Sequence, residues 1–375
     1  MFEFTLFWEL QHANKIFTFS CLVVTFLFLS SAGLVMAKRM DSPGAVYTMT
    51  NSISNNEVLV FDRSANGSLS PVGEFETGGI GTGGGLGNQG GVLLTSDNQW
   101  LYVVNAGSNT ISVFKVKPHG LEFIGSVDSG GLQPVSLTVD GDLLYVLNAG
   151  GAVGGEDNIN GFIIKPDGML QSLAGSTQPL SAANTSPAQI GFSTDGNVLV
   201  VAEKDTSKID TFVVDDVGLA RPPTIFDSAG TVPFGFSFSK RNRLYVSEAG
   251  TSSASSYKVY PDGDLEVISS VVGNFQAGVC WLVVTENGRY AYTTNAGTGN
   301  ISLFSIDRDG TISYDVNADA IGGVIDEALT NDSRYLYALS SGAQKIFGYQ
   351  VSSDGRLTKV EEIDLTTGAN GLAAK

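Results

Sequence analysis

The sequence predicts an all-β protein: a seven-bladed β-propeller with four-stranded blades, whose ring is closed by the C-terminal strand. Three observations lead to this prediction. One strand pattern recurs along the chain, seven tight turns close with glycine at intervals of 45 to 53 residues, and helical periodicity is nearly absent after residue 37. Repeats of this length are typical of propeller blades, each of which needs its neighbours to bury its faces.

The centre of the repeat is a strand built around a tyrosine. It reads Leu-Tyr-Val-Val-Asn at 101–105 and recurs, with variation, at 46–50, 144–148, 199–203, 244–248, 291–295 and 336–340. After a polar loop each copy is followed by another strand, such as 110–114, 208–212 or 300–304. These runs alternate apolar with polar residues and are rich in β-branched and aromatic types, which is typical of half-buried strands.

Each of these following strands ends in a tight turn that closes with glycine. In Pro166-Asp167-Gly168, proline presets φ, aspartate caps its own turn and glycine takes the positive φ. The seven closing glycines are Gly67, Gly120, Gly168, Gly218, Gly263, Gly310 and Gly355. We expect all seven to adopt the left-handed conformation.

A second kind of hairpin turn precedes the tyrosine strand in every repeat except the first. These turns lie at 96–99, 139–142, 194–197, 240–243, 286–289 and 331–334. The first repeat starts directly at its tyrosine strand, and an unassigned piece, 368–374, is left at the other end of the chain. We expect that piece to supply the innermost strand of the first blade, which removes exposed strand edges.

The first 37 residues have the order of a secretory signal peptide. Lys15 precedes an apolar run over 16–29, and small residues lead to Val35-Met36-Ala37. The apolar run is short for a membrane span, although Glu3 and Glu9 leave an uncleaved anchor or a later start codon open. We therefore expect a signal over 1–37, a propeller over 45–375, and a secreted or periplasmic protein with no membrane attachment after cleavage.

Charge and cysteine content narrow the range of partners. The chain has 38 acidic and 21 basic residues, a net charge of −17, which disfavours nucleic acid and anionic lipid. Beyond residue 37 the single cysteine, Cys280, cannot form an intrachain disulfide, and it reads as a buried strand residue. We expect a monomer that binds a small molecule.

A propeller separates its connections between two faces. Hairpin turns of both kinds described above lie on one face, which we call the plain face. The longer connections lie on the other, which we call the loop face, around the mouth of the central channel; they include 77–90, 148–159 and 177–187. Binding residues tend to lie on loops held by a rigid scaffold, so this mouth is the predicted site.

Polar residues near the mouth form the candidate site. The candidate catalytic residues are Glu203, Lys204, Glu248 and Asp326, and the candidate ligand-binding residues are Asn88, Gln89, Asn105, Gln189, Gln276 and Asn295. Two acids that face one channel can act as general acid and base or hold Ca²⁺, and a lysine can stabilise an oxyanion. The alternative is structural, with these groups capping loops and satisfying backbone groups between blades.

Histidine chemistry is excluded from the mouth. His119 is the only histidine after residue 37, and it lies in a turn assigned to the plain face. No triad or metal site that depends on histidine can therefore be assembled at the mouth, and we expect no cofactor apart from a possible Ca²⁺.

Over about 45–375 the chain resembles the lactonase family of seven-bladed propellers, which includes bacterial 6-phosphogluconolactonase and fungal carboxy-muconate cyclase. Within it the chain is most similar to an exported branch labelled 3-carboxymuconate cyclase-like. The resemblance rests on the Tyr-x-x-Asn strands and on the segments 84–89, 201–205, 233–236, 280–281, 292–297 and 371–373. Members of the family are associated with a histidine and arginines near a glutamate. In this chain the histidine has no counterpart, the arginines fall mainly in plain-face turns, and Glu203 or Glu248 matches the glutamate only loosely.

The resemblance implies a lactonase-like hydrolase or cyclase that acts on a small lactone or carboxylate at the mouth. In a hydrolase, Glu203 or Asp326 would activate water, and Lys204 or loop amides would stabilise the oxyanion. One alternative is a non-catalytic propeller outside the cytoplasm that binds a protein or glycan. Another is a Ca²⁺-dependent hydrolase with Glu203, Glu248 and neighbouring amides around the ion.

Overall fold

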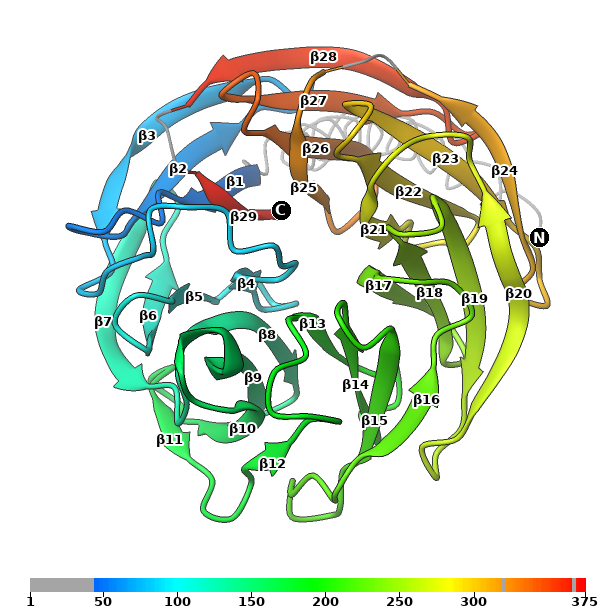
Figure 1. Ribbon diagram of the computed structural model, residues 1–375. Helices are drawn as coiled ribbons and strands as arrows, with labels where there is room; N and C mark the ends of the chain where they lie inside the picture. Colours follow the sequence, from blue (N-terminus) through cyan, green and yellow to red (C-terminus); the bar gives the residue numbers. More distant parts are fainter. Residues whose placement is uncertain (1–43, 319–320, 366–368) are drawn as a thin grey trace, which may run out of the picture. The chain divides into compact units, whose positions relative to one another are not determined.

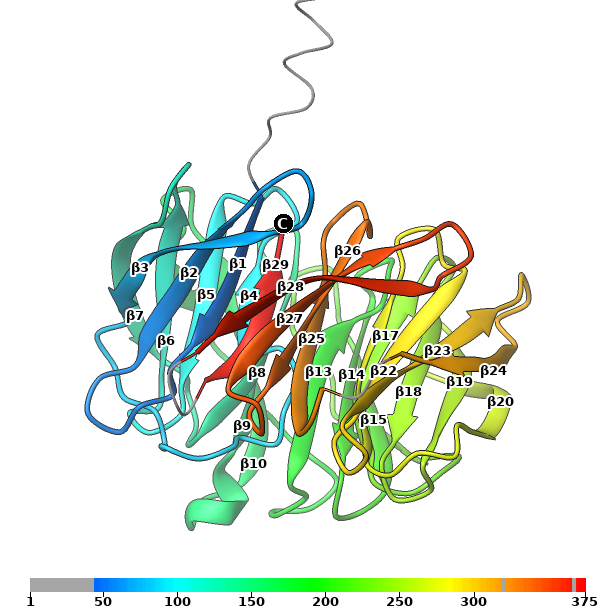
Figure 2. The same ribbon diagram turned by 90° about the horizontal axis from the view of Figure 1, so that it is seen from above.

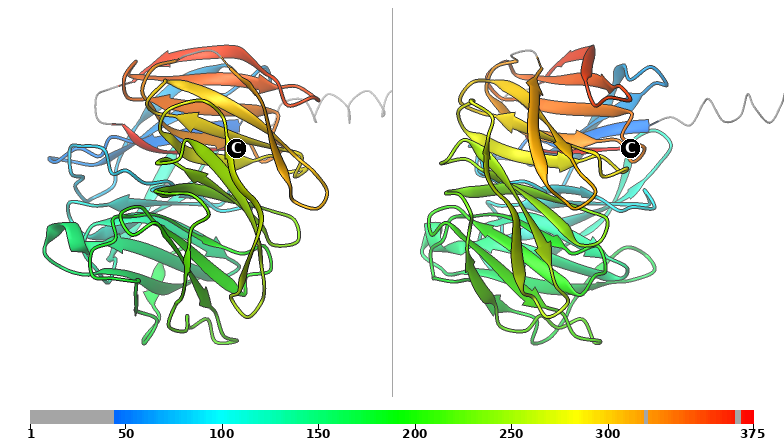
Figure 3. Two further views of the ribbon diagram at one scale, coloured as in Figure 1. Left: turned by 45° about the vertical axis from the view of Figure 1, so that its right-hand side comes forward. Right: turned by 90° about the vertical axis from the view of Figure 1, so that its right-hand side faces the viewer.

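The computed structural model describes residues 44–318, 321–365 and 369–375. They form seven antiparallel sheets arranged as blades around a central channel (Figure 1), which confirms the predicted propeller. Within these residues the helical structure is limited to one 3₁₀ turn, η1 (Gly150–Val153). Figure 3 shows from the side how each sheet packs against its neighbours.

The first three blades, with their strands in order from the channel outward, are as follows. Blade 1 is β29 (Asn370–Ala374), β1 (Gly44–Met49), β2 (Glu57–Arg63) and β3 (Leu69–Glu76). Blade 2 is β4 (Val92–Leu94), β5 (Trp100–Asn105), β6 (Thr110–Val116) and β7 (Leu121–Asp128). Blade 3 is β8 (Pro134–Asp140), β9 (Leu143–Ala149) and β10 (Asp157–Ile164), with its outer position shared by β11 (Leu170–Ser172) and β12 (Gln178–Pro179).

The other four blades are regular. Blade 4 is β13 (Pro187–Phe192), β14 (Val198–Glu203), β15 (Lys208–Val213) and β16 (Thr224–Asp227). Blade 5 is β17 (Pro233–Ser239), β18 (Arg243–Glu248), β19 (Ser253–Val259) and β20 (Leu265–Gly273). Blade 6 is β21 (Val279–Val284), β22 (Tyr290–Asn295), β23 (Asn300–Ile306) and β24 (Ile312–Asn317). Blade 7 is β25 (Val324–Leu329), β26 (Tyr335–Ser340), β27 (Lys345–Val351) and β28 (Leu357–Asp364).

In four blades the repeated tyrosine links its blade to the next. The ring is buried between two sheets, and the hydroxyl donates to the carbonyl of the closing glycine in the following blade. This bond joins Tyr102 to Gly168 (3.1 Å), Tyr145 to Gly218 (2.8 Å), Tyr292 to Gly355 (2.6 Å) and Tyr337 to Gly67 (2.7 Å). Thr211 and Ser256 make the same kind of bond to Gly263 and Gly310. The tyrosine and the turn therefore recur together because they are two halves of one contact.

The closing glycines adopt the predicted conformation. All seven have φ between +83° and +97°, a region in which side chains with a Cβ are strained. The left-handed turn presents the glycine carbonyl to the preceding blade. The prediction from the turn sequences is confirmed.

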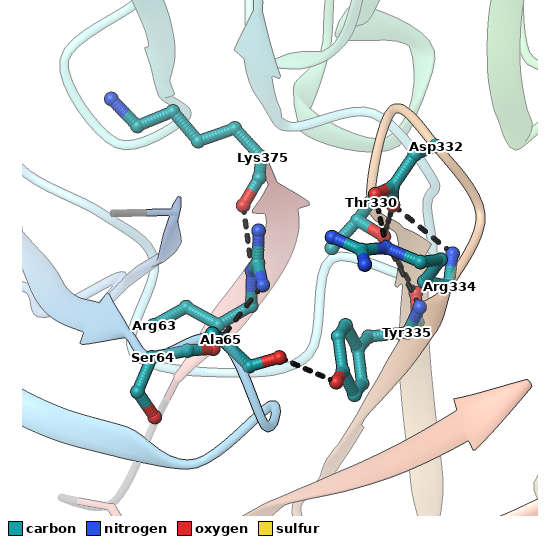
Figure 4. Close-up of polar contacts among 8 residues, drawn as sticks. All are labelled: Arg63, Ser64, Ala65, Thr330, Asp332, Arg334, Tyr335 and Lys375. Carbon is teal, nitrogen blue, oxygen red and sulfur yellow. Dashed lines mark hydrogen bonds and ion pairs between the residues drawn. The ribbon is translucent and has the colours of Figure 1, made fainter. Parts of the chain in front are cut away.

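The ring is closed by β29, as predicted. It pairs with β1 through Val46 opposite Ala374 and Tyr47 opposite Ala373. Arg63 reinforces the closure, because its Nε donates to the Lys375 carbonyl at 2.9 Å while its guanidinium lies 5.3 Å from the centre of the Tyr335 ring. Figure 4 shows this contact together with the 2.8 Å hydrogen bond from the Tyr335 hydroxyl to the Ala65 carbonyl.

The two faces differ as the sequence predicts. In Figure 2 the propeller is seen from the side, with η1 on one face and the C-terminus toward the other. His119 lies in the β6–β7 turn on the plain face, exposed, with its Nδ1 2.7 Å from Asp62 Oδ2. The predicted signal over 1–37 lies outside the described residues, and within the described part no helix has the length and apolarity needed to cross a membrane.

Candidate functional site

The innermost strands of five blades bulge near their first residues. The strand register shifts near the start of β8, β13, β17, β21 and β25, and such bulges turn side chains away from their regular alternation. Buried Ala188, Phe234 and Trp281 meet at this level, with Cys280 and Ile325 packed against them. The Phe234 and Trp281 ring centres are 4.9 Å apart. We call these five residues the channel floor.

The glycine-rich loop crosses the channel at this floor. The Trp281 indole donates to the Asn88 carbonyl at 2.7 Å, and the Asn88 side chain donates to the Val135 carbonyl. The Gln89 amide bonds both backbone groups of Leu282, donating at 2.9 Å and accepting at 3.1 Å. Asn88 and Gln89, predicted to bind a ligand, thus hold the loop across the channel.

Lys204 lies beside this loop, just after β14 ends. Its Nζ donates to the Gly87 carbonyl and lies 5.0 Å from the centre of the Phe234 ring, a cation–π arrangement. Burial lowers the pKa of Lys204 to about 8, and the negative charge of Asp205 opposes part of that change. The site therefore has a half-buried lysine, able to exist in both protonation states near neutral pH, against an aromatic floor.

Glu203 points between blades 3 and 4. Its carboxylate accepts hydrogen bonds from the Ser181 backbone N–H at 3.0 Å, from the Ser181 hydroxyl and from the Thr206 hydroxyl at 2.5 Å. Asp210 on β15 faces the same carboxylate. Burial, followed by a hydrogen bond to Glu203 and its charge, raises the pKa of Asp210 to about 8. Asp210 is therefore held in its protonated form at neutral pH.

Four other blades have an asparagine or a glutamate at the position that Glu203 occupies in blade 4: Asn105, Asn148, Glu248 and Asn295. All are fully buried. Glu248 accepts from the Ser228 hydroxyl at 2.6 Å, and burial raises its pKa to about 7. Asn105 donates to Ser112 at 2.7 Å, and Asn295 donates to Ser302 at 2.9 Å. A residue at this strand end therefore links the third strand of its own blade to the loop that leads into that blade.

The remaining predicted residues lie in two places. Gln276 is on the loop face, where its carbonyl oxygen accepts from the Asn300 amide at 2.7 Å. Gln189 bonds both backbone groups of Phe236, at 3.0 and 2.7 Å, in the neighbouring blade. Gln189 also lines the channel, together with Asp326.

Beyond the floor the channel contains a cavity of about 440 Å³. Its lining includes Gln89, Gln189, Asp326 and Glu327, and it reaches Asn331 in a plain-face turn. Burial raises the pKa of Asp326 well above its usual range, while hydrogen bonds from the N–H groups of Glu327 and Leu372 partly oppose this. The cavity lining includes Asp326 but not Lys204, so these two groups do not face the same cavity.

The predicted residues therefore do not form one cluster. Lys204, Asn88 and Gln89 meet at the floor, whereas Glu203 and Glu248 lie in separate interfaces between blades. Among the described residues, no group of three or more histidine, cysteine or acidic side chains has an arrangement that could hold a metal ion. Asp210 is not among the residues predicted from the sequence. Its signal was an aspartate at the strand position that holds Ser112 in blade 2 and Ser302 in blade 6.

Comparison with known proteins agrees with this fold. A periplasmic gluconolactonase of Pseudomonas aeruginosa is 17% identical, with a TM-score of 0.71 over 88% of this chain and 98% of that one. A 6-phosphogluconolactonase candidate from Bacteroides fragilis is 20% identical, with a TM-score of 0.70 over 90% and 99%. At such identities the likeness concerns the fold, and no curated protein sequence matches the chain.

The sequence itself carries the family assignment. The protein-family sequence model described as "Lactonase, 7-bladed beta-propeller" matches residues 45–153 and 236–369, more than half of the chain. The first stretch includes the whole glycine-rich loop, and the second includes Trp281 but begins just after Phe234. With its seven blades and ring closure, the chain belongs to the lactonase family of seven-bladed β-propellers.

Proposed function

We propose that this protein hydrolyses a small lactone at the loop face, with the Lys204 ammonium stabilising the oxyanion. The observation that carries the proposal is a lysine whose pKa is lowered to about 8 beside an apolar aromatic floor. Family membership supports a lactone as substrate. The gluconolactonase of similar fold suggests a sugar-acid lactone as the class to try first.

The chemistry follows from the charge that develops on the lactone. Water attack on the carbonyl carbon places negative charge on the carbonyl oxygen, and the ring C–O bond then breaks to give a hydroxy acid. An ammonium has three donors, of which the Gly87 carbonyl takes one. The aromatic floor excludes water from one side of Lys204, which strengthens its interaction with the oxyanion.

Water activation stays a separate part of the proposal. The Glu203 carboxylate already accepts three hydrogen bonds, and Asp326 lines the cavity beyond the floor. A lactone is a reactive ester, so carbonyl polarisation by Lys204 is the step for which the described residues are best arranged. Glu203→Gln and Asp326→Asn test whether either carboxyl group contributes.

The substitution Lys204→Met tests the proposal directly. We expect kcat to fall on the order of a hundredfold, because one oxyanion donor is removed while the aliphatic stem stays. The measurement is acid release from a panel of γ- and δ-lactones of sugar acids. Lys208→Met is the matched control, since Lys208 lies in the same hairpin but pairs with Asp227 at 2.5 Å.

The pH dependence gives a second readout. Because the ammonium form is required, kcat/KM of the wild type should decrease as pH rises through about 8. Lys204→Met should lose that decrease. If no lactone is turned over, the non-catalytic alternative, binding of a protein or glycan outside the cytoplasm, becomes the better description.

A further inference from the structure

Two clefts on the plain face are equivalent in construction. Each lies between two neighbouring blades. It is bordered by the turn between the first and second strands of each blade, and by the turn after the third strand of the blade that comes second in sequence. One, between blades 2 and 3, has a volume of about 720 Å³, and the other, between blades 5 and 6, has about 450 Å³. We call them the 2/3 cleft and the 5/6 cleft.

The two clefts carry opposite charge. The side chains that line the 2/3 cleft include Asp97, Asp140, Asp142 and Lys165. The 5/6 cleft is lined by one acidic residue, Asp307, and by five basic residues: Lys240, Arg241, Arg243, Arg289 and Arg308. These five are almost a quarter of the 21 basic residues in a chain of net charge −17.

The fold does not require arginine at these positions. Counted from the repeated tyrosine, Arg243 corresponds to Trp100 and Arg289 to Asp142. Counted from the closing glycine, Arg308 corresponds to Pro166. The same turns therefore form with aromatic, acidic or proline residues at these positions. The arginines of the 5/6 cleft are not needed to form its turns.

Within the part of the chain that the structure describes, the arginines of this cleft are free of ion pairs, and Arg289 also lies over the Tyr290 ring, 5.3 Å from its centre. In the described ranges, Arg241, Arg243, Arg289 and Arg308 take part in no ion pair within 4.0 Å. Two arginines in the plain-face turns of blade 7 are paired: Arg334 Nε is 2.6 Å from Asp332 and Arg356 Nε is 3.4 Å from Asp354. Besides Asp307, two acidic residues lie nearby. Glu286 is 3.7 Å from Lys240, and the pKa of Asp309 is lowered mainly by a hydrogen bond from the Thr311 backbone and to a smaller extent by the charge of Arg243.

We propose that the 5/6 cleft binds a small molecule that carries a tetrahedral oxyanion, a phosphate or sulfate group. Guanidinium groups bind such oxyanions in bidentate fashion, and several around one cleft can contact one group together. A volume of about 450 Å³ suits a small molecule. The strongly negative chain repels a long polyanion, so a compact anion is favoured over nucleic acid or a sulfated polymer. The site is independent of the proposed lactonase site on the other face.

Calorimetric titration of the full chain with inorganic phosphate, pyrophosphate and sulfate tests the proposal. We expect saturable binding of at least one of them, with phosphate and sulfate arms showing which oxyanion is preferred. The double variant Arg289→Gln/Arg308→Gln should bind at least about tenfold more weakly, because charged hydrogen bonds are lost. Both residues are exposed in turns, so the variant should unfold at the wild-type temperature.

Arg334→Gln is the matched control, since this arginine lies in the equivalent turn of blade 7 and does not line the cleft. Its binding should equal that of the wild type. The proposal is overturned by an absence of saturable binding at millimolar anion, by equal weakening in the control, or by tighter binding of a single-stranded oligonucleotide or heparin. Lactone turnover by the double variant should be unchanged, so failure of anion binding is distinguishable from failure of the proposed function.

Discussion

Glu203 and Asp210 form a pair of carboxyl groups at two positions that hold an asparagine and a serine in other blades. Where blades 2 and 6 place Asn105 with Ser112 and Asn295 with Ser302, blade 4 places two carboxyl groups. Asparagine can donate and accept, so those pairs are satisfied at any pH. The carboxyl pair needs a proton to make the same link, which makes this interface sensitive to pH.

The substitution Asp210→Asn should therefore stabilise the protein at alkaline pH. Folding raises the pKa of Asp210 from 3.8 to about 8, so the folded state binds more protons than the unfolded state in this range. The contribution of Asp210 to the free energy of unfolding is fully present below about pH 3.8 and is lost as pH rises to 8. The measurement is denaturant unfolding at pH 6 and at pH 9. Between these two pH values the free energy of unfolding should fall less in Asp210→Asn than in the wild type, by at least about 1 kcal/mol.

Asp216→Asn is the control for that measurement. Asp216 is exposed in the β15–β16 connection, so its substitution should leave the pH dependence of stability unchanged. Equal pH dependence in the wild type and in Asp210→Asn would contradict the raised pKa of Asp210.

Among the loops and strands, the glycine-rich loop depends on a glycine far from it in sequence. A Cβ at Gly235 would lie 2.1 Å from Gln89 Oε1 and 2.8 Å from the Cys280 carbonyl oxygen. In blades 4 and 7, Gln189 and Asp326 occupy the corresponding strand position and bond the next blade's backbone. Blade 5 has no side chain there, and Gln89 from the loop makes the bond to Leu282 instead.

Gly235→Ala should destabilise the protein by about 1–3 kcal/mol, because the added methyl overpacks the channel. Adding Gln89→Ala should recover only part of the loss, since the Cys280 carbonyl is also close. The measurement is a double-mutant cycle by denaturant unfolding. Gly85→Ala in the same loop is the control: a Cβ there meets no atom within 4 Å, so its effect should stay within about 0.5 kcal/mol. Additive losses for Gly235→Ala and Gln89→Ala would argue against this packing.

The strands and turns could be predicted because their signals are local. Alternation around Tyr102 or Tyr292, and a glycine such as Gly168 closing a turn, are visible within a few residues of sequence. The direction of a side chain at the mouth is not local. One extra residue in a bulge near Cys280 or Ile325 reverses which side faces the channel. For this reason the sequence located Glu203 and Lys204 near the mouth but could not show that they point apart.

At the scale of the whole molecule, ring closure depends on one five-residue strand. β29 supplies the inner strand of blade 1, and Arg63 links its Lys375 carbonyl to the Tyr335 ring of blade 7 (Figure 4). Blades 1 and 7 also share a buried cluster that includes Leu372 and Ala374. Loss of β29 would expose a strand edge of β1 and the side of that cluster.

Truncation after Thr366 should therefore abolish cooperative unfolding. Without β29, blade 1 has no inner strand and the ring opens, so thermal denaturation followed by circular dichroism should lose its sharp transition. Size-exclusion chromatography should show aggregation, since an unpaired edge and an apolar face are exposed. Lys375→Ala, which keeps the carbonyl that Arg63 binds, should melt like the wild type. A normal melting transition in the truncated chain would contradict closure of the ring by β29.

The pairing of β29 with β1 also sets an order of events during synthesis. The Thr48 hydroxyl donates to the Asn370 carbonyl at 3.3 Å across 322 positions of sequence, so this contact cannot form until residue 370 has been translated. Blades 2 to 7 are each built from continuous sequence, whereas blade 1 stays without its inner strand throughout elongation. Such distant contacts are slow to form. The growing chain therefore carries a three-stranded blade 1 until residues 370–374 have been synthesised, and before that point the edge of β1 is open to other chains.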